Sequence, residues 1–390
     1  MRIVKWIVGI VLALLVVGVA GFLILAPGIV ERGRNVVEQH GPYPVTAEGA
    51  AFHDSLLIGD WHADTLLWKR DPLERGTRGH VDVPRLIEGN VTLQVFTAVT
   101  KSPAGQNYDE NSTEAFDNIT LLAIAQMWPP RTWNSLLERA LFQAERLRDA
   151  VARSNGRLRL IRTEKDLDAV LALRASGENV VGGLLGIEGA HPLEGQIANL
   201  DRLEAAGYRV IGLQHFFDNA LGGSLHGIGN QGLTEFGRDV VREVAARGMV
   251  LDLAHSSQQV ARDVLDLTDI PLVVSHTGIR SHCETNRNYP DDLMQEIAAT
   301  GGVIGIGYWE DVTCDDSPSG VARTIKAAIE LVGEDHVALG SDYDGSVTTG
   351  YDTSELAALT QAMLDVGLTE EQIRKVAGEN MVRVLRARLN

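Results

Sequence analysis

Short, nearly continuous apolar runs alternate along the chain with longer stretches in which apolar residues recur every three to four positions. The short runs are typical of parallel strands covered by helices on both faces, and the longer stretches are typical of the amphipathic helices that cover them. This alternation predicts an α/β fold, a single (β/α)8 barrel of the TIM type, with a doubly wound open sheet as the alternative. The apolar runs lie at residues 56–67, 91–99, 180–189, 208–216, 248–255, 271–276, 301–308 and 336–343.

The connection between the second and third runs is the longest and predicts a helical insertion. Residues 112–155 have the pattern of two helices, which are separated at Trp128-Pro129-Pro130 because proline ends a helix. A further strand-like run at 158–163 is short and leads directly into a helix capped by Thr163, so we interpret it as an excursion from the barrel. We expect the insertion to form a lid or a homodimer contact.

The N-terminal segment has a different character from the rest of the chain. Residues 6–26 are uncharged and mostly apolar, and about twenty such residues suffice to cross a bilayer as a helix. Arg2 and Lys5 favour a cytoplasmic N-terminus at residues 1–5. The stretch exceeds the usual apolar region of a signal peptide and no clear cleavage site follows, which favours an uncleaved signal anchor over a cleaved peptide.

The rest of the chain is then exported. We expect a linker over residues 27–50 and one folded domain over 51–390, on the periplasmic or extracellular face of a membrane. The formal net charge of −17 argues against a nucleic-acid surface, because such surfaces depend on Lys and Arg. The two cysteines, Cys283 and Cys314, are consistent with either a disulfide in an oxidising compartment or two buried thiols.

Polar residues of metal-binding type stand where the apolar runs end. The active site of such a barrel forms at the carboxyl ends of its strands, so these side chains are expected to converge. Histidine nitrogens and carboxylate oxygens are zinc ligands, and this set exceeds the three protein ligands that one catalytic zinc usually takes. The sequence therefore predicts two metal ions per chain with a shared hydroxide as nucleophile. The residues are His62, Asp64, Glu188, His215, His255, His276 and Asp342.

The segments around these residues resemble one family from Leu56 to the C-terminus: the membrane (renal-type) dipeptidases, a metallopeptidase branch of the amidohydrolase superfamily. The resemblance is specific because several motifs occur together in the family's order. They read DWHADTL, GIEGAHPL, LQH, VLDLAHSS, VVSHTGIRSHCETNRNYPDD and ALGSDYDG. It implies an exported zinc enzyme that hydrolyses dipeptides with an L- or D-residue at the C-terminus.

The resemblance also implies a role for each residue. One zinc ion would be bound by His62 and Asp64 and the other by His255 and His276, while Glu188 would bridge both. Asp342 would be the base and proton shuttle, and His215 would polarise the scissile carbonyl and stabilise the oxyanion. Arg287 would hold the terminal carboxylate of the substrate. The family has a similar cysteine pair, which implies a disulfide between Cys283 and Cys314.

Several alternatives stay open. Asp344 competes with Asp342 as base, because two residues along a strand point the same way. His191 is either a ligand or a residue that orients the loop or Glu188, His336 belongs to the opposite end of the barrel, and His226 and His282 are undecided. Residues 216–232 depart from the family's Asn-rich loop, which leaves the substrate open. A lactone, cyclic amide or phosphoester hydrolase and an inactive binding barrel are the competing functions.

Overall fold

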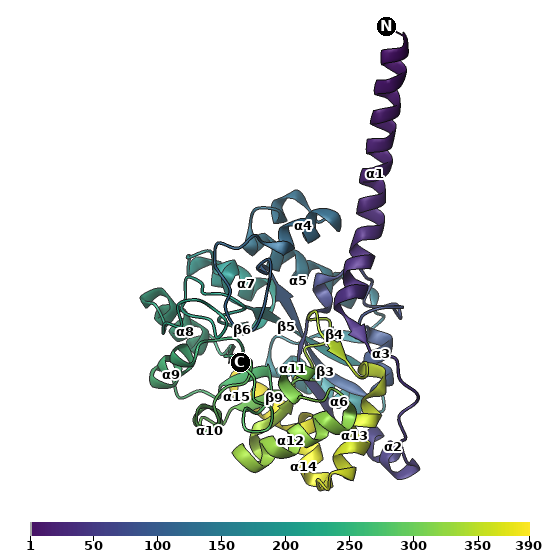
Figure 1. Cartoon of the computed structure of the whole chain (residues 1–390). Helices are drawn as coiled ribbons and strands as arrows, with labels where there is room; N and C mark the ends of the chain where they lie inside the picture. Colours follow the sequence, from purple (N-terminus) through teal and green to yellow (C-terminus); the bar gives the residue numbers. More distant parts are fainter. Residues whose placement is uncertain (1) are drawn as a thin grey trace.

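Eight parallel strands form a closed barrel in the computed structural model, which describes residues 2–390 of the chain (Figure 1). Met1, part of the predicted cytoplasmic N-terminus, lies outside the described residues. Each predicted run contains one strand, and pairing of β3 with β5 closes the sheet, which confirms the barrel and excludes the open sheet. In spatial order the strands are β3 (Val91–Val99), β2 (Ile58–Ala63), β10 (Val337–Leu339), β9 (Val303–Ile306), β8 (Val273–Thr277), β7 (Val250–Asp252), β6 (Tyr208–Gly212) and β5 (Val181–Glu188).

The strand-like run at 158–163 forms a short strand, β4 (Leu158–Leu160), outside the barrel. It pairs with the first residues of β5, Val181 to Gly183, whereas β6 pairs with β5 from Leu185 onward. The insertion before it contains α4 (Asn118–Ala125) and α5 (Leu136–Arg153), separated by a 3-10 turn at Pro130–Thr132. The predicted helical insertion between the second and third barrel strands is therefore present.

Helices surround the barrel, and the one that follows β4 is capped by Thr163 as predicted. The side chains of Thr163, Thr234 and Ser257 accept hydrogen bonds from backbone N–H groups in the first turns of three of them. The helices are α2 (Ala47–Asp54), α3 (Val83–Glu88), α6 (Glu164–Ala175), α7 (Ala198–Ala206), α8 (Glu235–Ala246), α9 (Gln258–Leu267), α10 (Asp291–Ala298), α11 (Glu310–Thr313), α12 (Pro318–Val332), α13 (Leu356–Asp365), α14 (Glu370–Arg374) and α15 (Asn380–Arg388).

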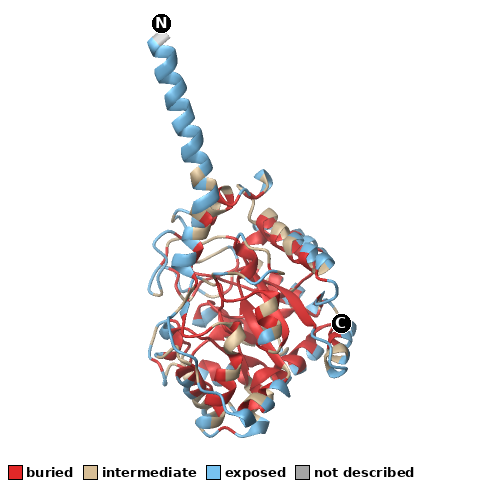
Figure 2. Cartoon of the chain, turned by 90° about the vertical axis from the view of Figure 1, so that its right-hand side faces the viewer, coloured by how far each residue is buried: buried red, intermediate tan, exposed pale blue. Residues whose placement is uncertain are grey.

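The core divides between the two faces of the strands. Leu93 and Val95 of β3 pack with residues of the other strands, of α6 and of α15, whereas Phe96 and Ala98 pack in the larger cluster, which includes most of the surrounding helices. This alternation is the period of two expected for a strand. The barrel strands are buried, except that Arg209 of β6 is half-buried (Figure 2). Side chains on the inner face near the carboxyl ends of the strands are therefore positioned by a rigid wall.

A single long helix, α1 (Arg2–Arg34), projects from the domain (Figures 1 and 2). It contains the predicted span 6–26, is long and apolar enough to cross a membrane, and exposes nearly all of its apolar side chains. The helix continues into the segment predicted as a linker. After it, β1 (Val36–Val37) pairs with β11 (Thr348–Thr349), and α2 follows, so much of 27–50 is ordered against the domain.

The buried carboxylate of Glu31 explains why the end of α1 is fixed. It forms ion pairs with Arg70 and Arg78, and Arg70 also pairs with Asp344, near the end of the barrel. Asn35 adds a hydrogen bond from the backbone N–H of Ser346, at 2.9 Å. Ion pairs between residues that are far apart in the sequence leave no local pattern. The sequence of residues 27–50 therefore predicts only a linker.

Glu31→Gln should destabilise the folded domain, because it leaves two guanidinium groups without their shared carboxylate. Breaking a buried pair costs roughly 3 to 5 kcal/mol. For a domain of this size we expect Tm to fall by about 5 °C or more, measured by scanning calorimetry on the purified chain. The matched control is Glu48→Gln at an exposed position of α2, which should leave Tm unchanged. Equal Tm values for both variants would show that the Glu31 contacts do not hold the helix.

Candidate metal centre and active site

Five of the predicted ligands meet at the carboxyl end of the barrel. His62 lies near the end of β2, Glu188 is the last residue of β5 and His276 belongs to β8. Asp64 and His255 lie in the segments that directly follow β2 and β7. All five side chains are buried. Because parallel strands end on the same side of a barrel, residues that are far apart in sequence become neighbours here.

The carboxylate of Glu188 lies between two groups of ligand atoms. Its Oε1 is 3.5 Å from His62 Nε2, 3.1 Å from His255 Nε2 and 3.5 Å from His276 Nε2. The two Nε2 atoms of His255 and His276 are 2.9 Å apart. On the other side, His62 Nε2 is 3.6 Å from Asp64 Oδ1. This arrangement places Glu188 in contact with both predicted pairs.

The ligand atoms also group within the dimensions of metal sites. One oxygen or nitrogen from each of His62, Asp64 and Glu188 lies within 4.8 Å of the other two. The same holds for two overlapping sets, His62 with His276 and Asp342, and Glu188 with His215 and His255.

The charge balance of this cluster fits divalent cations. Burial raises the pKa of Glu188 and of Asp342 well above the usual range, and it lowers the pKa of His255 and His276 well below theirs. The rings of His255 and His276 therefore stay neutral, and the carboxyl groups of Glu188 and Asp342 hold a proton unless a cation is near. Burial opposes protonation of His62, but the neighbouring carboxylate of Asp64 raises its pKa. Buried carboxylates need a compensating charge, and neutral imidazole with carboxylate is a zinc ligand set. Within residues 2–390, His62 Nε2 has no hydrogen-bond partner, so this atom is free to bind a metal.

Two hydroxyl groups orient three of the predicted ligands through hydrogen bonds. Ser275 Oγ lies 3.2 Å from His62 Nδ1 and 2.8 Å from His276 Nδ1, which turns both Nε2 atoms toward Glu188. Thr97 donates a hydrogen bond of 2.5 Å to Asp64 Oδ1. Such partners fix the ring orientation of metal ligands. Neither residue was predicted from the sequence, although Ser275 directly precedes a predicted ligand.

Asp60 is a third residue of the site that was not predicted from the sequence. Its buried carboxylate accepts hydrogen bonds from the backbone N–H groups of His62 and Ser341, the hydroxyl of Ser341 and the amide of Gln94. It thereby ties β2 to the segment after β10. Its position two residues before His62 in a strand was the available signal, because both side chains then face the barrel interior.

The two candidate bases turn in different directions. Asp342 lines the pocket at the barrel mouth, and its Oδ1 is 3.8 Å from His62 Nε2. The carboxylate of Asp344 instead accepts hydrogen bonds from Thr65 Oγ1 at 2.9 Å and the backbone N–H of His80 at 2.7 Å, and it pairs with Arg70. Although burial alone would raise its pKa, Arg70 and His80 hold the pKa of Asp344 well below the usual range.

The assumption that Asp342 and Asp344 point the same way was wrong. Both lie beyond the end of β10, with φ angles of 59° and 63°, so the period of two for a strand does not apply to them. Asp344 is committed to structural contacts. The structure therefore favours Asp342 as the carboxylate that is available for chemistry.

His215 and Arg287 flank the cluster. His215 Nε2 is 3.3 Å from Glu188 Oε2, its Nδ1 is 3.2 Å from the carbonyl oxygen of Lys101, and burial lowers its pKa to about 4. The Arg287 side chain is buried and donates one hydrogen bond of 2.6 Å, from Nη2, to the carbonyl oxygen of His276. Among the described residues its Nε has no partner. Arg287 thus keeps donors for a further anion.

The pocket above the cluster has a volume of about 80 Å³. Its walls include Tyr108 from the long connection after β3 and Phe216 from the divergent loop. His226 stacks on Phe216 and lies 2.9 Å, through Nδ1, from the carbonyl oxygen of Tyr108, so it braces this wall. Sequence patterns gave no signal for Tyr108 because it lies outside every strand.

His191, His282 and His336 have other surroundings, although His191 lies beside His215. His191 stacks on Phe217 of the divergent loop, with the ring centroids 4.6 Å apart. His336 Nδ1 is 2.9 Å from the carbonyl oxygen of Gly302, at the start of β10 and so at the opposite end of the barrel. His282 is in the exposed part of the loop after β8.

A disulfide joins Cys283 and Cys314, with Cα atoms 5.6 Å apart. Cys283 lies in the loop that carries Arg287, and Cys314 ends α11 after β9. The bond therefore links the loops that follow two neighbouring strands at the barrel mouth.

Comparisons with known proteins agree with this geometry. Residues 48–389 match the family model described as membrane dipeptidase, peptidase family M19. An uncharacterized dipeptidase of Schizosaccharomyces pombe is 29% identical over 331 residues, which cover 80% of this chain and 73% of that protein.

Solved structures of a dipeptidase and of a metallopeptidase are also similar to this chain. The dipeptidase AC, a metallopeptidase of family M19, has a TM-score of 0.69 and 26% identity over 86% of this chain and 99% of that chain. A metallopeptidase from Rhodobacter sphaeroides, liganded with a phosphinate mimic of the dipeptide L-Ala-D-Ala, has a TM-score of 0.69 and 26% identity over 85% of this chain and 99% of that chain.

Proposed function

The chain belongs to the membrane dipeptidase family, peptidase family M19, and from its site we propose a zinc-dependent enzyme that cleaves L-Xaa-L-Xaa or L-Xaa-D-Xaa dipeptides. Membership makes it a hydrolase of the metallopeptidase class. The single observation that carries the proposal is the position of Glu188, whose Oε1 lies within 3.5 Å of nitrogen atoms from both predicted ligand pairs.

The proposed ligand sets share this carboxylate. His62 and Asp64 would hold one zinc ion, His255 and His276 would hold the other, and Glu188 would contact both. Two zinc ions held there would supply Lewis acidity that activates water and polarises the scissile carbonyl. Ser275 and Thr97 keep the ligands in place through hydrogen bonds to the Nδ1 atoms of His62 and His276 and to Asp64 Oδ1.

Asp342 is proposed to move the proton. Its carboxylate lines the same pocket as Asp64, Glu188 and His255, and it is not committed to an ion pair such as that of Asp344 with Arg70. It would accept a proton from the attacking water and pass it to the nitrogen of the leaving amine.

His215 and Arg287 are proposed to hold the substrate. His215 lines the pocket, and the carbonyl oxygen of Lys101 accepts from its Nδ1–H, which fixes the ring. Its Nε2 donates to the developing oxyanion in the imidazolium form, which the negative charge of the oxyanion would stabilise against the effect of burial. The planar guanidinium of Arg287 suits a carboxylate, which it can bind through two parallel hydrogen bonds. The dipeptide mimic in the Rhodobacter sphaeroides relative supports a small substrate and a tolerated D-residue.

The proposed location is a membrane, with the catalytic domain outside the cytoplasm. The apolar helix α1 supports anchoring. The disulfide between Cys283 and Cys314 supports an oxidising compartment, because such bonds are rare in the cytosol.

Substitution of the two aspartates separates their roles. Asp342→Asn should retain both metal ions and lower kcat by about 10² to 10⁴, because it removes a general base. Asp344→Asn should lower Tm through loss of the Arg70 pair and should reduce kcat less. Metal content by elemental analysis, Tm and dipeptide turnover check this. An active Asp342→Asn enzyme beside an inactive but folded Asp344→Asn enzyme would assign the base to Asp344.

Substitution of Arg287 tests recognition of a substrate C-terminus. Arg287→Lys keeps the charge but loses the planar geometry, so kcat/KM on a free dipeptide should fall by roughly ten- to a hundredfold, with metal content unchanged. The control substrate is the dipeptide amide, which the native enzyme should cleave poorly and for which the substitution should cost little. Equal cleavage of acid and amide, both indifferent to the substitution, would favour a lactone, cyclic amide or phosphoester substrate.

A further inference from the structure

A second and larger pocket adjoins the catalytic one. Its volume is about 410 Å³, and one of its walls is the end of α1, where it contributes Phe22, Ala26, Pro27, Val30 and Arg34. The opposite wall is α4. The two pockets have several lining residues in common, so they share a wall rather than lying on separate faces. The shared residues are Leu67, Ser102, Gln106, Ile119 and Ser346.

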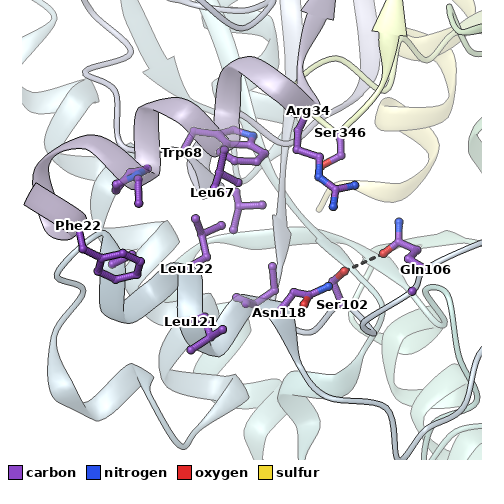
Figure 3. A pocket seen from close by; sticks show the side chains of 16 residues that line it. Phe22, Arg34, Leu67, Trp68, Ser102, Gln106, Asn118, Leu121, Leu122 and Ser346 are labelled. Atoms are coloured by element: carbon purple, nitrogen blue, oxygen red, sulfur yellow. Dashed lines mark hydrogen bonds between the residues drawn. The ribbon is translucent and has the colours of Figure 1, made fainter. Parts of the chain in front are cut away.

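The larger pocket has an apolar end and a polar end (Figure 3). Phe22, Leu121 and Leu122 lie at one end. Arg34 and Ser346 lie at the other, as do Ser102 and Gln106, which are joined by a hydrogen bond of 2.7 Å. Its polar end carries the polar residues that are shared with the catalytic pocket. The surface therefore changes from apolar to polar as it approaches the metal ligands.

The apolar end lies on the side where α1 leaves the domain. Figure 1 shows α4 on that side of the barrel, and α1 and α4 are in contact. Phe116, Leu121 and Met127, in and around α4, are exposed large apolar side chains outside α1. If α1 crosses a bilayer, these side chains lie close to its surface. Exposed apolar groups in such a place are typical of a membrane contact.

We infer that the larger pocket holds the apolar tail of an amphipathic dipeptide, which reaches the catalytic pocket from the bilayer. The tail would lie between α1 and α4, and the dipeptide head would pass the shared polar residues to the metal ligands. The inference rests on the proposed function and on anchoring through α1, and it extends the substrate class to dipeptides that carry a long alkyl chain. The shared wall favours such a substrate over a bilayer lipid, because a lipid would not need access to the metal ligands.

The test compares two substrates on the full chain in lipid nanodiscs. The substrates are dipeptides of alanine and lysine, in both orders, with either an acetyl or a dodecanoyl group on the lysine Nζ. The two groups give the same charge and differ only in chain length. In at least one order, the native chain should have a kcat/KM for the dodecanoyl substrate at least about tenfold above that for the acetyl substrate, because the longer chain is removed from water.

A tryptophan in the pocket should remove this advantage. Ala26→Trp fills the space between α1 and α4, so the ratio should fall to about threefold or less, while kcat/KM on the acetyl substrate stays within about twofold. Ala13→Trp is the matched control, because Ala13 lies on the same helix outside the pocket. If Ala26→Trp does not fold, Leu121→Gln at an exposed pocket position decides, with an expected fall of about threefold in the ratio.

Each contrary outcome has a distinct meaning. Cleavage of the acetyl dipeptide with no tail advantage would overturn this inference and leave the dipeptidase proposal intact. A tail advantage that a folded Ala26→Trp chain keeps in full would assign the effect to the bilayer and overturn this inference. So would an advantage that Ala13→Trp reduces as much as Ala26→Trp, or one that Leu121→Gln leaves unchanged. Zinc-loaded protein that cleaves neither substrate would overturn the proposed function, and this inference with it.

Discussion

The arrangement of the residues at the barrel mouth depends on their contacts with the buried carboxylate of Glu188. Its Oε1 lies within 3.5 Å of nitrogen atoms from three histidines, and Asp64 and Asp342 add two further buried carboxylates nearby. A group of carboxylates out of water is costly unless cations neutralise it. The hydrogen bonds from Ser275 and Thr97 keep the ligands in place, and the proposed pair of metal ions would account for both the charge and the geometry.

The helix that leaves the domain is connected to the same mouth. Glu31 on α1 pairs with Arg70, Arg70 pairs with Asp344, and Asp344 lies two residues after the proposed base. The end of α1 therefore braces the loop that carries Asp342 and also forms a wall of the pocket beside it. The proposed membrane anchor and the proposed catalytic pocket are thus connected through Glu31, Arg70 and Asp344, and the inferred tail pocket lies where they meet.

The sequence predicted the features of the fold that depend on local periodicity and on the order of the strands. Each of the eight apolar runs contains a barrel strand, and the polar residues at their ends meet because parallel strands end on one side. Periodicity could not predict the direction of Asp344, because the backbone there is left-handed and outside any strand. It also missed the ion pairs of Glu31 and the role of Tyr108, which depend on contacts between residues far apart in sequence.

The most direct test of the central claim is anomalous diffraction at the zinc edge from crystals of the zinc-loaded protein. The account predicts two peaks about 3.5 to 4 Å apart, one beside His62 and Asp64 and the other beside His255 and His276, with the Glu188 carboxylate touching both. A single fully occupied peak in an active enzyme, or two peaks of which Glu188 touches only one, would contradict it.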